Sequence, residues 1–223
     1  MDMDISENLK RISFEIEEAK AKFRKSGDNV RIMAVTKTVP YARVNEAVKE
    51  GITLLGENRV QEYLEKKDFY DKSAEVHFIG HLQTNKIKYI ADSVTMIHSV
   101  DSARLAAEID RQAGKVGKRL DVLLEVNIGG EDTKSGVDAD RLEELFEEAS
   151  QLENISIRGL MTIPPVGKSE EAFEKMQRLF EDMKSGHIGI DTLSMGMSSD
   201  YALAVKYGSN IVRIGSRIFG ARK

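Results

Sequence analysis

The sequence predicts an α/β fold in which eight parallel strands close into a single (β/α)8 barrel of the TIM type. Eight short apolar runs recur along the chain, amphipathic segments separate them, and no Pro/Gly/Ser-rich linker divides the 223 residues. One repeat averages about 24 residues, which suits a strand, a helix and two short connections. An open, doubly wound sheet is the structural alternative. We expect residues 1–223 to form one domain.

The elements are expected where the periodicity changes. The eight strands are predicted at residues 32–35, 53–56, 76–80, 95–98, 121–127, 157–161, 192–196 and 211–215. A helix at about residues 6–25 precedes them, stands outside the repeat, and would close the barrel floor or pack beside it. Further helices are expected to begin at Pro40 and after cap residues at Ser102, Asp138 and Ser169.

Composition excludes several classes of protein. The net charge is −4, with 33 basic and 37 acidic residues, and no basic tract is present, so nucleic acid and anionic membranes are not expected as partners. The absence of cysteine excludes disulfides and thiolate chemistry. The N-terminal segment is acidic and lacks the apolar core of a secretory signal, so we expect a cytoplasmic protein.

Lys37 ends the first predicted strand, just before a helix start marked by Thr38 and Pro40. The carboxyl ends of barrel strands form the face on which such folds keep their chemistry. A lysine amine at this position can attack an aldehyde and form a Schiff base. The alternative is a solvated lysine at a strand end.

Two glycine-serine corners follow the seventh and eighth predicted strands, at residues 196–199 and 215–216. Loops at these positions of a barrel often bind phosphate through backbone N–H groups and a helix N-terminus. Glycine lets the backbone approach the anion, and serine adds a hydroxyl donor. Ser198 and Ser199 could instead cap the helix expected at residues 200–207, and Ser216 could be a turn residue. The presence of both corners favours the phosphate site.

Arg213 alternates with apolar neighbours, so it shares one strand face with Gly215. If that face is the barrel interior, the guanidinium needs a partner. A heteroaromatic nitrogen would serve as acceptor, and so would a carboxylate such as Glu125. The histidines suggest no metal, because the four-residue spacing of His77 and His81 falls on a strand and loop rather than a helix.

Seven motifs, taken together and in order, resemble the pyridoxal phosphate homeostasis protein family, whose single domain is similar to the barrel of bacterial alanine racemase. The motifs are AVTKTVP, LLGENRVQE, HFIGHLQTNK, EVNIGGEDTKSG, LMTIPP, LSMGMSSDY and VRIGSRIFGAR. The resemblance covers about residues 30–222 and implies pyridoxal 5′-phosphate held as an aldimine. It implies the following binding residues: Lys37 for the aldimine, Met197, Ser198, Gly215 and Ser216 for the phosphate, Arg213 for the pyridine nitrogen and Asn58 near the phenolic side of the ring.

The resemblance implies a carrier or regulator of the cofactor without an established reaction. The residues agree, because an arginine facing the pyridine nitrogen disfavours its protonation and makes the ring a weak electron sink. Racemization would also need a second base, which alanine racemase takes from an extra domain that we do not expect here. A pyridoxal-dependent racemase, a Schiff-base aldolase and a protein-interaction module remain alternatives. We expect a monomer whose partners include apo-enzymes that use the cofactor.

Overall fold

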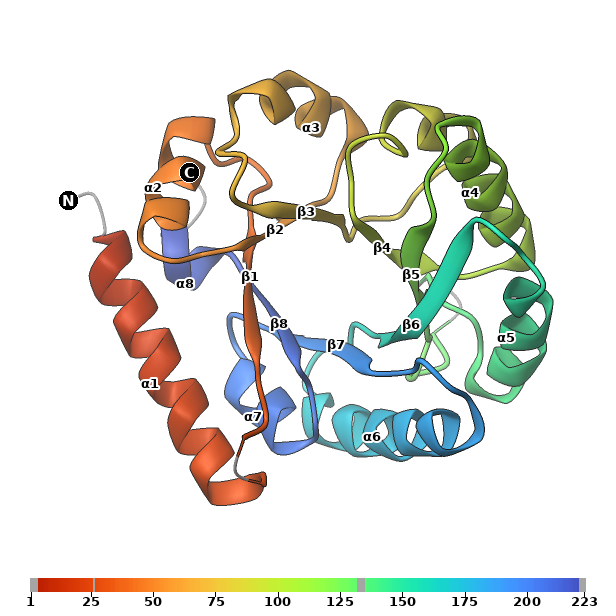
Figure 1. Cartoon of the computed structure of the whole chain (residues 1–223). Helices are drawn as coiled ribbons and strands as arrows, with labels where there is room; N and C mark the ends of the chain where they lie inside the picture. The colour runs from red at the N-terminus through yellow and green to blue at the C-terminus, as the bar shows by residue number, and fades with distance from the viewer. Residues whose placement is uncertain (1–3, 26, 132–134, 221–223) are drawn as a thin grey trace.

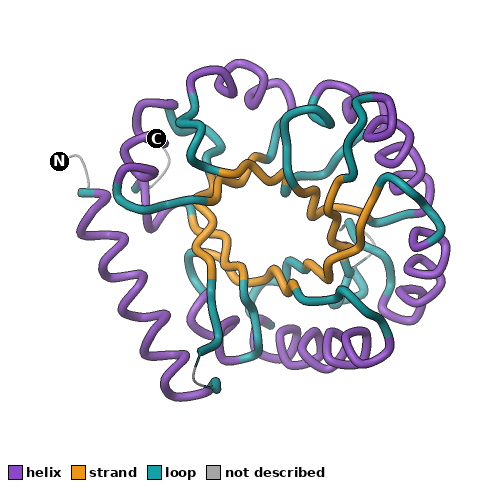
Figure 2. The backbone as a smooth tube through the Cα atoms, in the orientation of Figure 1, coloured by secondary structure: helices purple, strands orange, loops and turns teal. Residues whose placement is uncertain are grey.

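The strands form a closed barrel in a computed structural model that describes residues 4–25, 27–131 and 135–220. Each strand pairs in parallel with the next, and β1 pairs with β8, so that Met33 lies beside Arg213. Figure 2 shows the resulting ring of strands inside a ring of helices. This closure confirms the predicted barrel and excludes the open sheet. The strands are β1 Arg31–Val35, β2 Leu54–Glu57, β3 Glu75–Phe78, β4 Met96–Val100, β5 Leu120–Glu125, β6 Ile155–Met161, β7 Thr192–Met197 and β8 Ile211–Ile214.

The helices follow the predicted order, with differences at their ends. The α-helices are α1 Ile5–Phe23, α2 Tyr41–Lys49, α3 Val60–Lys66, α4 Ala103–Lys115, α5 Leu142–Ser150, α6 Ser169–Gly186, α7 Tyr201–Lys206 and α8 Ser216–Phe219, and the 3-10 helices are η1 Lys67–Phe69, η2 Thr84–Tyr89 and η3 Ala139–Arg141. Only η2 separates β3 from β4, where a full amphipathic helix was expected.

The predicted capping contacts are wrong in detail. Ser102 is the N-cap of α4, but its hydroxyl donates to Asp101 rather than accepting from the helix. Asp138 precedes η3 rather than α5, and Ser169 is already helical, with its hydroxyl bonded to Asp200.

Helix α1 packs beside the barrel, against α7, α8 and α2, rather than across its floor (Figure 1). Asn8 Nδ2 donates to the carbonyl of Ile218 at 3.0 Å, and the Glu15 carboxylate accepts from Tyr201 at 2.5 Å and from Arg217 at 2.6 Å. Arg217 therefore ties α1 to the barrel. None of the helices in the described ranges is long and apolar enough to cross a membrane.

The barrel interior holds two small apolar clusters and a group of polar side chains. One cluster contains Met33, Val35, Leu54, Ile79 and Ile211, and the other contains Met96, Leu123 and Met161. The larger core lies between the outer face of the strands and the helices. This two-layer packing fixes the strand ends, and with them the loops that they carry.

Candidate functional site

A cavity of about 310 Å³ opens at the carboxyl ends of β1, β2, β3, β6, β7 and β8, and we call it the mouth cavity. It is lined by Val35, Lys37, Asn58, Ile79, Ile163, Met197, Ser198, Ser199, Arg213, Gly215 and Ser216. All seven predicted binding positions line it, although 179 positions separate Lys37 from Ser216 in the sequence. The pairing of β1 with β8 brings them together. The volume lies within the range of small-molecule sites.

Lys37 sits in a turn that is held on both sides. The next residue, Thr38, has a φ of 63°, which is a strained conformation for a β-branched residue. Its N–H donates to Glu62 of α3 at 2.5 Å. Lys66 of the same helix pairs with Glu62 and donates to the carbonyl of Thr36 at 3.0 Å. Helix α3 therefore fixes the turn that presents Lys37 to the cavity.

Asn58 follows β2 and points into the mouth cavity, whereas the preceding Glu57 points away. The Asn58 Oδ1 is buried and has no hydrogen-bond partner among the described residues. Glu57 accepts a hydrogen bond from Tyr70, and burial raises the pKa of this carboxyl. A side chain at Gly80 would lie 2.1 Å from the backbone oxygen of Asn58, so only glycine leaves room for this backbone. Asn58 is thus placed with an unsatisfied polar atom available to a ligand.

The first glycine-serine corner is not a helix cap. The N-cap of α7 is Asp200, which accepts from the N–H of Met197 at 2.7 Å. The Ser198 hydroxyl instead accepts from the N–H of Gly215 at 3.3 Å and joins the two corners. Gly196 has a φ of 90°, and a Cβ there would lie 2.4 Å from that of Ala204. The capping alternative for Ser198 is therefore wrong.

The second corner approaches β1 closely. A Cβ at Gly215 would lie 3.3 Å from the carbonyl oxygen of Val35 and 3.4 Å from its Cβ, so glycine keeps the two strands together at the cavity. Helix α8 after this corner has four residues and α7 has six. The prediction relied partly on a helix N-terminus, but so few aligned peptides produce a small macrodipole. Individual N–H groups and serine hydroxyls must provide most of the attraction for an anion.

Arg213 is 5% exposed and lies on the interior face of β8, the case in which its guanidinium needs a partner. Its Nη1 donates to the Ser194 carbonyl at 2.7 Å and to the Ser194 hydroxyl at 2.8 Å, and its Nη2 donates to the Thr162 carbonyl at 2.8 Å. Burial lowers the pKa of the guanidinium to about 10, so it remains a cation near pH 7. These bonds engage three of its five N–H donors.

Glu125 does not serve as the direct partner of Arg213. No ion pair joins them among the described residues, and Glu125 influences the guanidinium only at longer range. Burial, reinforced by Asp101, raises the pKa of Glu125 to about 7, while Arg213 opposes the rise. The alternative in which a carboxylate satisfies Arg213 is therefore wrong as a contact.

Several polar side chains near the same face lie outside the mouth cavity, and sequence reasoning missed three of its apolar walls. The groups outside it follow β3, β4 and β5, and include His81, Gln83, Asn85, Asp101 and Asn127. The missed walls are Val35, Ile79 and Ile163. Strand alternation signals Val35, two positions before Lys37. Residues 132–134 of the EVNIGGEDTKSG motif lie outside the described ranges.

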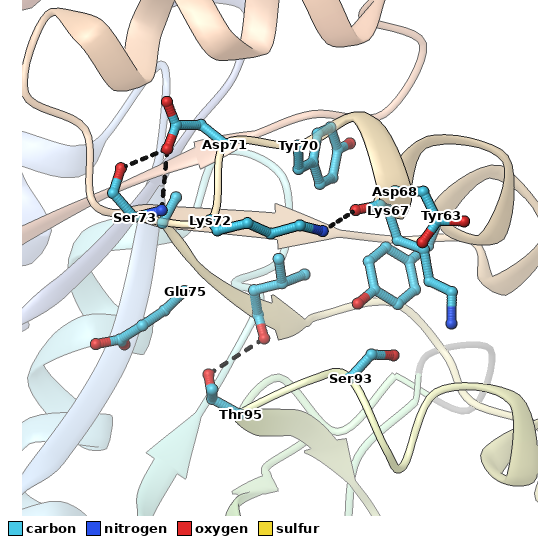
Figure 3. Close-up of a pocket in the computed structure, with 12 residues that line it drawn as sticks. Tyr63, Lys67, Asp68, Tyr70, Asp71, Lys72, Ser73, Glu75, Ser93 and Thr95 are labelled. Atoms are coloured by element: carbon cyan, nitrogen blue, oxygen red, sulfur yellow. Dashed lines mark hydrogen bonds between the residues drawn. The ribbon is translucent and has the colours of Figure 1, made fainter.

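A second cavity, of about 360 Å³, lies near the start of β3, and we call it the floor cavity (Figure 3). Its polar groups bond mainly to one another. Asp71 accepts from the N–H of Ser73 at 3.0 Å and from its hydroxyl at 2.8 Å, and Lys72 donates to the Lys67 carbonyl at 3.1 Å. In the described residues, no three His, Cys, Asp or Glu side chains gather closely enough to hold a metal.

The barrel and its mouth define a protein of the alanine racemase class of barrels. Residues 8–223 match the family model described as alanine racemase, N-terminal domain. The chain is 41% identical over 227 residues to the pyridoxal phosphate homeostasis protein of Aquifex aeolicus, covering 99% of this chain and 100% of that protein. It is 36% identical over 227 residues to the protein of the same name from Escherichia coli, covering 98% and 97%. The chain therefore belongs to the pyridoxal phosphate homeostasis protein family.

A solved relative bears on the site. PipY of Synechococcus elongatus has been solved with pyridoxal phosphate (PLP) bound, and that structure matches with a TM-score of 0.81 and 32% identity, covering 97% of this chain and 100% of that one. The structure of the same protein without PLP matches with a TM-score of 0.87 at the same identity and coverage.

Proposed function

We propose that this chain binds pyridoxal 5′-phosphate covalently at Lys37 and carries or buffers the cofactor within the cell. Convergence of Lys37 with both glycine-serine corners in one cavity is the observation that supports this proposal. When bound, the group supplies an aldehyde that condenses with an amine, with loss of water, and a conjugated ring that absorbs visible light.

The residues of the mouth cavity suit the aldehyde, the phosphate and the ring of pyridoxal 5′-phosphate. Lys37 provides the amine. The corners at Met197–Ser198 and Gly215–Ser216 provide phosphate donors through the hydroxyl and N–H groups of their serines, because the N–H groups of Met197 and Gly215 already donate to Asp200 and Ser198. The buried amide oxygen of Asn58 has no hydrogen-bond partner among the described residues, so it fits the polar phenolic edge of the ring. Val35, Ile79 and Ile163 supply apolar walls for the ring faces.

Arg213 supports binding without turnover. A buried cation that faces the pyridine nitrogen disfavours a proton there, and an unprotonated ring withdraws electrons poorly from a bound amino acid. We therefore propose a carrier or regulator rather than a racemase or Schiff-base aldolase, and we propose apo-enzymes that require the cofactor as its recipients.

Borohydride trapping tests the covalent proposal. The purified protein is mixed with pyridoxal 5′-phosphate, reduced and digested, and the modified peptide is identified by mass spectrometry. We expect the adduct on Lys37 and a visible absorption band that disappears on reduction. Failure to take up the cofactor in excess, or an adduct confined to other lysines, would contradict the proposal.

Deuterium exchange separates a carrier from a racemase. The loaded protein is incubated with α-deuterated amino acids, and we expect no loss of the label above the rate given by the free cofactor. Loss of the label at an enzymatic rate would favour the racemase.

A further inference from the structure

Four polar side chains cross the barrel interior in a line, from the mouth toward the floor. His98 and Ser194 are fully buried, and His77 and Arg213 are 2% and 5% exposed. They come from β3, β4, β7 and β8, and the two apolar clusters of the interior surround them. Buried polar groups in such a setting destabilise the fold unless each one is hydrogen-bonded.

The contacts between them are continuous. Arg213 Nη1 lies 2.8 Å from Ser194 Oγ, which lies 3.1 Å from His98 Nδ1. His98 Nε2 lies 2.9 Å from His77 Nδ1. The far nitrogen of His77, Nε2, lies 3.6 Å from the carboxylate of Glu75, which borders the floor cavity and pairs with Arg31. This last contact is longer than a hydrogen bond, so it orients the ring by electrostatic attraction.

Arg213 at one end and Glu75 at the other both require each hydrogen bond to be donated in the direction from Arg213 toward Glu75. A guanidinium can only donate, so Ser194 accepts from Arg213 and has its own proton free for His98 Nδ1. The Glu75 carboxylate can only accept, so the proton of a neutral His77 belongs on Nε2. His77 Nδ1 then accepts from His98 Nε2, and His98 Nδ1 accepts from Ser194. Every donor from Arg213 to His98 meets an acceptor, and the Nε2–H of His77 faces the Glu75 carboxylate at 3.6 Å.

The direction requires both imidazoles to be neutral, and their surroundings make them so. Burial is the largest cause that lowers the pKa of His77 to about 4, with Arg31 adding to it. Burial also lowers the pKa of His98 well below its usual value, and the neighbouring His77 and Arg213 add to the effect.

We propose that Ser194, His98 and His77 are positioning residues that hold the Arg213 guanidinium in its orientation at the mouth cavity, with both imidazoles fixed as the Nε2–H tautomer. The Thr162 carbonyl holds the second nitrogen of the guanidinium, so the side chain is fixed from two strands. The consequence for a ligand rests on the proposed function, because it assumes that Arg213 faces the pyridine ring. The tautomers do not depend on it.

The first test uses the ligand-free protein. The chain has four histidines, so ¹⁵N-histidine labelling and long-range ¹H–¹⁵N spectra can resolve each ring, with assignments from His81→Gln and His187→Gln variants. Between pH 6 and 9, we expect His77 and His98 to carry a proton on Nε2 and none on Nδ1. An Nδ1–H tautomer, or a charged ring, at either residue would overturn the proposal. This test needs no substitution of Arg213, Ser194, His98 or His77.

A matched pair of serine variants sharpens the test. Ser194→Ala removes the hydrogen bond that makes His98 Nδ1 an acceptor, so only the longer 3.6 Å contact between His77 and Glu75 still directs the protons, and we expect His98 to become a mixture of tautomers. Ser99→Ala is the control, because Ser99 is equally buried and its hydroxyl has no hydrogen-bond partner among the described residues. We expect its spectra to match the parent. An unchanged His98 tautomer in Ser194→Ala would contradict the fixed direction.

The second test measures the loaded protein. Ser194→Ala should weaken pyridoxal 5′-phosphate binding about tenfold and shift its absorption band, because Arg213 loses a hydrogen bond that involves a charge. Ser99→Ala should change neither. If the parent takes up no cofactor, the proposed function fails while the tautomer result stands. If the parent binds and Ser194→Ala binds with the same affinity and spectrum, the positioning role is overturned.

Discussion

The mouth and floor cavities are similar in size but differ in how their polar groups are arranged. The floor cavity is the larger, at about 360 Å³ against 310 Å³, and one continuous segment, residues 67–76, forms most of its wall. Its side chains bond to neighbours in the sequence, as Asp71 does to Ser73. The mouth combines residues from six strand ends and leaves the Asn58 Oδ1 without a hydrogen-bond partner among the described residues. The mouth therefore differs from the floor in the convergence of its polar groups and not in its volume, and this difference is why we propose the mouth as the binding site.

The largest expected effect tests the mouth directly. Lys37→Ala should reduce the affinity for pyridoxal 5′-phosphate more than 100-fold and abolish the visible band, because no amine remains to form the covalent bond. Spectroscopic titration measures both. Lys37→Arg is the matched control, since it keeps the positive charge but not the nucleophile, and it should lose the band as well. A visible band in either variant would mean that another lysine reacts.

The next largest effect concerns stability and comes from the buried carboxyl of Glu125. The folded-state pKa of Glu125 is raised from 4.5 to about 7, so the native state holds its proton more tightly than the unfolded chain. The free energy of unfolding should therefore fall as the pH rises from about 4.5 through 7. Glu125→Gln removes this titration and should be more stable than the parent by about 2 to 3 kcal/mol at pH 8, and equal to it near pH 4.5.

Urea unfolding of both proteins at pH 4.5, 6 and 8 provides the measurement. A difference in stability that is the same at all three pH values would show that Glu125 does not titrate in this range. Glu75, at the floor, is the contrasting carboxylate, because its hydrogen bond and ion pair with Arg31 help to lower its pKa.

Ser198 should give a smaller effect that depends on the ligand. Ser198→Ala removes one hydroxyl at the proposed phosphate site and should weaken pyridoxal 5′-phosphate binding about tenfold, as expected for a hydrogen bond to a charged group. Binding of pyridoxal, which lacks the phosphate, should be unchanged. Titration with the two ligands makes the comparison within one variant. An equal loss for both would place Ser198 away from the phosphate.

The floor should give the smallest effect. Lys72→Ala and Ser73→Ala remove contacts that the floor cavity makes within itself, so we expect less than a twofold change in cofactor affinity. The same titration measures it. A loss as large as that in Ser198→Ala would show that the two cavities are coupled.

The barrel could be predicted from the sequence because each strand is indicated by residues within its own short segment. All eight apolar runs became strands, with ends that differ by at most two residues, since period and turn residues determine a strand without knowledge of its neighbours. Lys37, Ser198 and Gly215 could be placed at one face because every parallel strand presents its carboxyl end there.

The contact between His77 and His98 could not be predicted in the same way. His77 was considered beside His81, four residues away, whereas its partner His98 lies 21 positions along the chain on the next strand. That contact depends on the register of β3 and β4, which pairs His77 with Met96. The caps at Ser102 and Ser169 failed for a related reason, because each hydroxyl found a partner outside its own helix, at Asp101 and Asp200.

The pairing of β1 with β8 requires the barrel to close before the cofactor can bind. Lys37 follows the first strand and Ser216 follows the last, so neither half of the barrel contains the complete proposed site. A ligand that spans this seam binds only the closed barrel and opposes its opening by mass action. Bound cofactor would therefore stabilise the pairing of β1 with β8. Resistance of these two strands to proteolysis should rise with the fraction of protein that carries the cofactor.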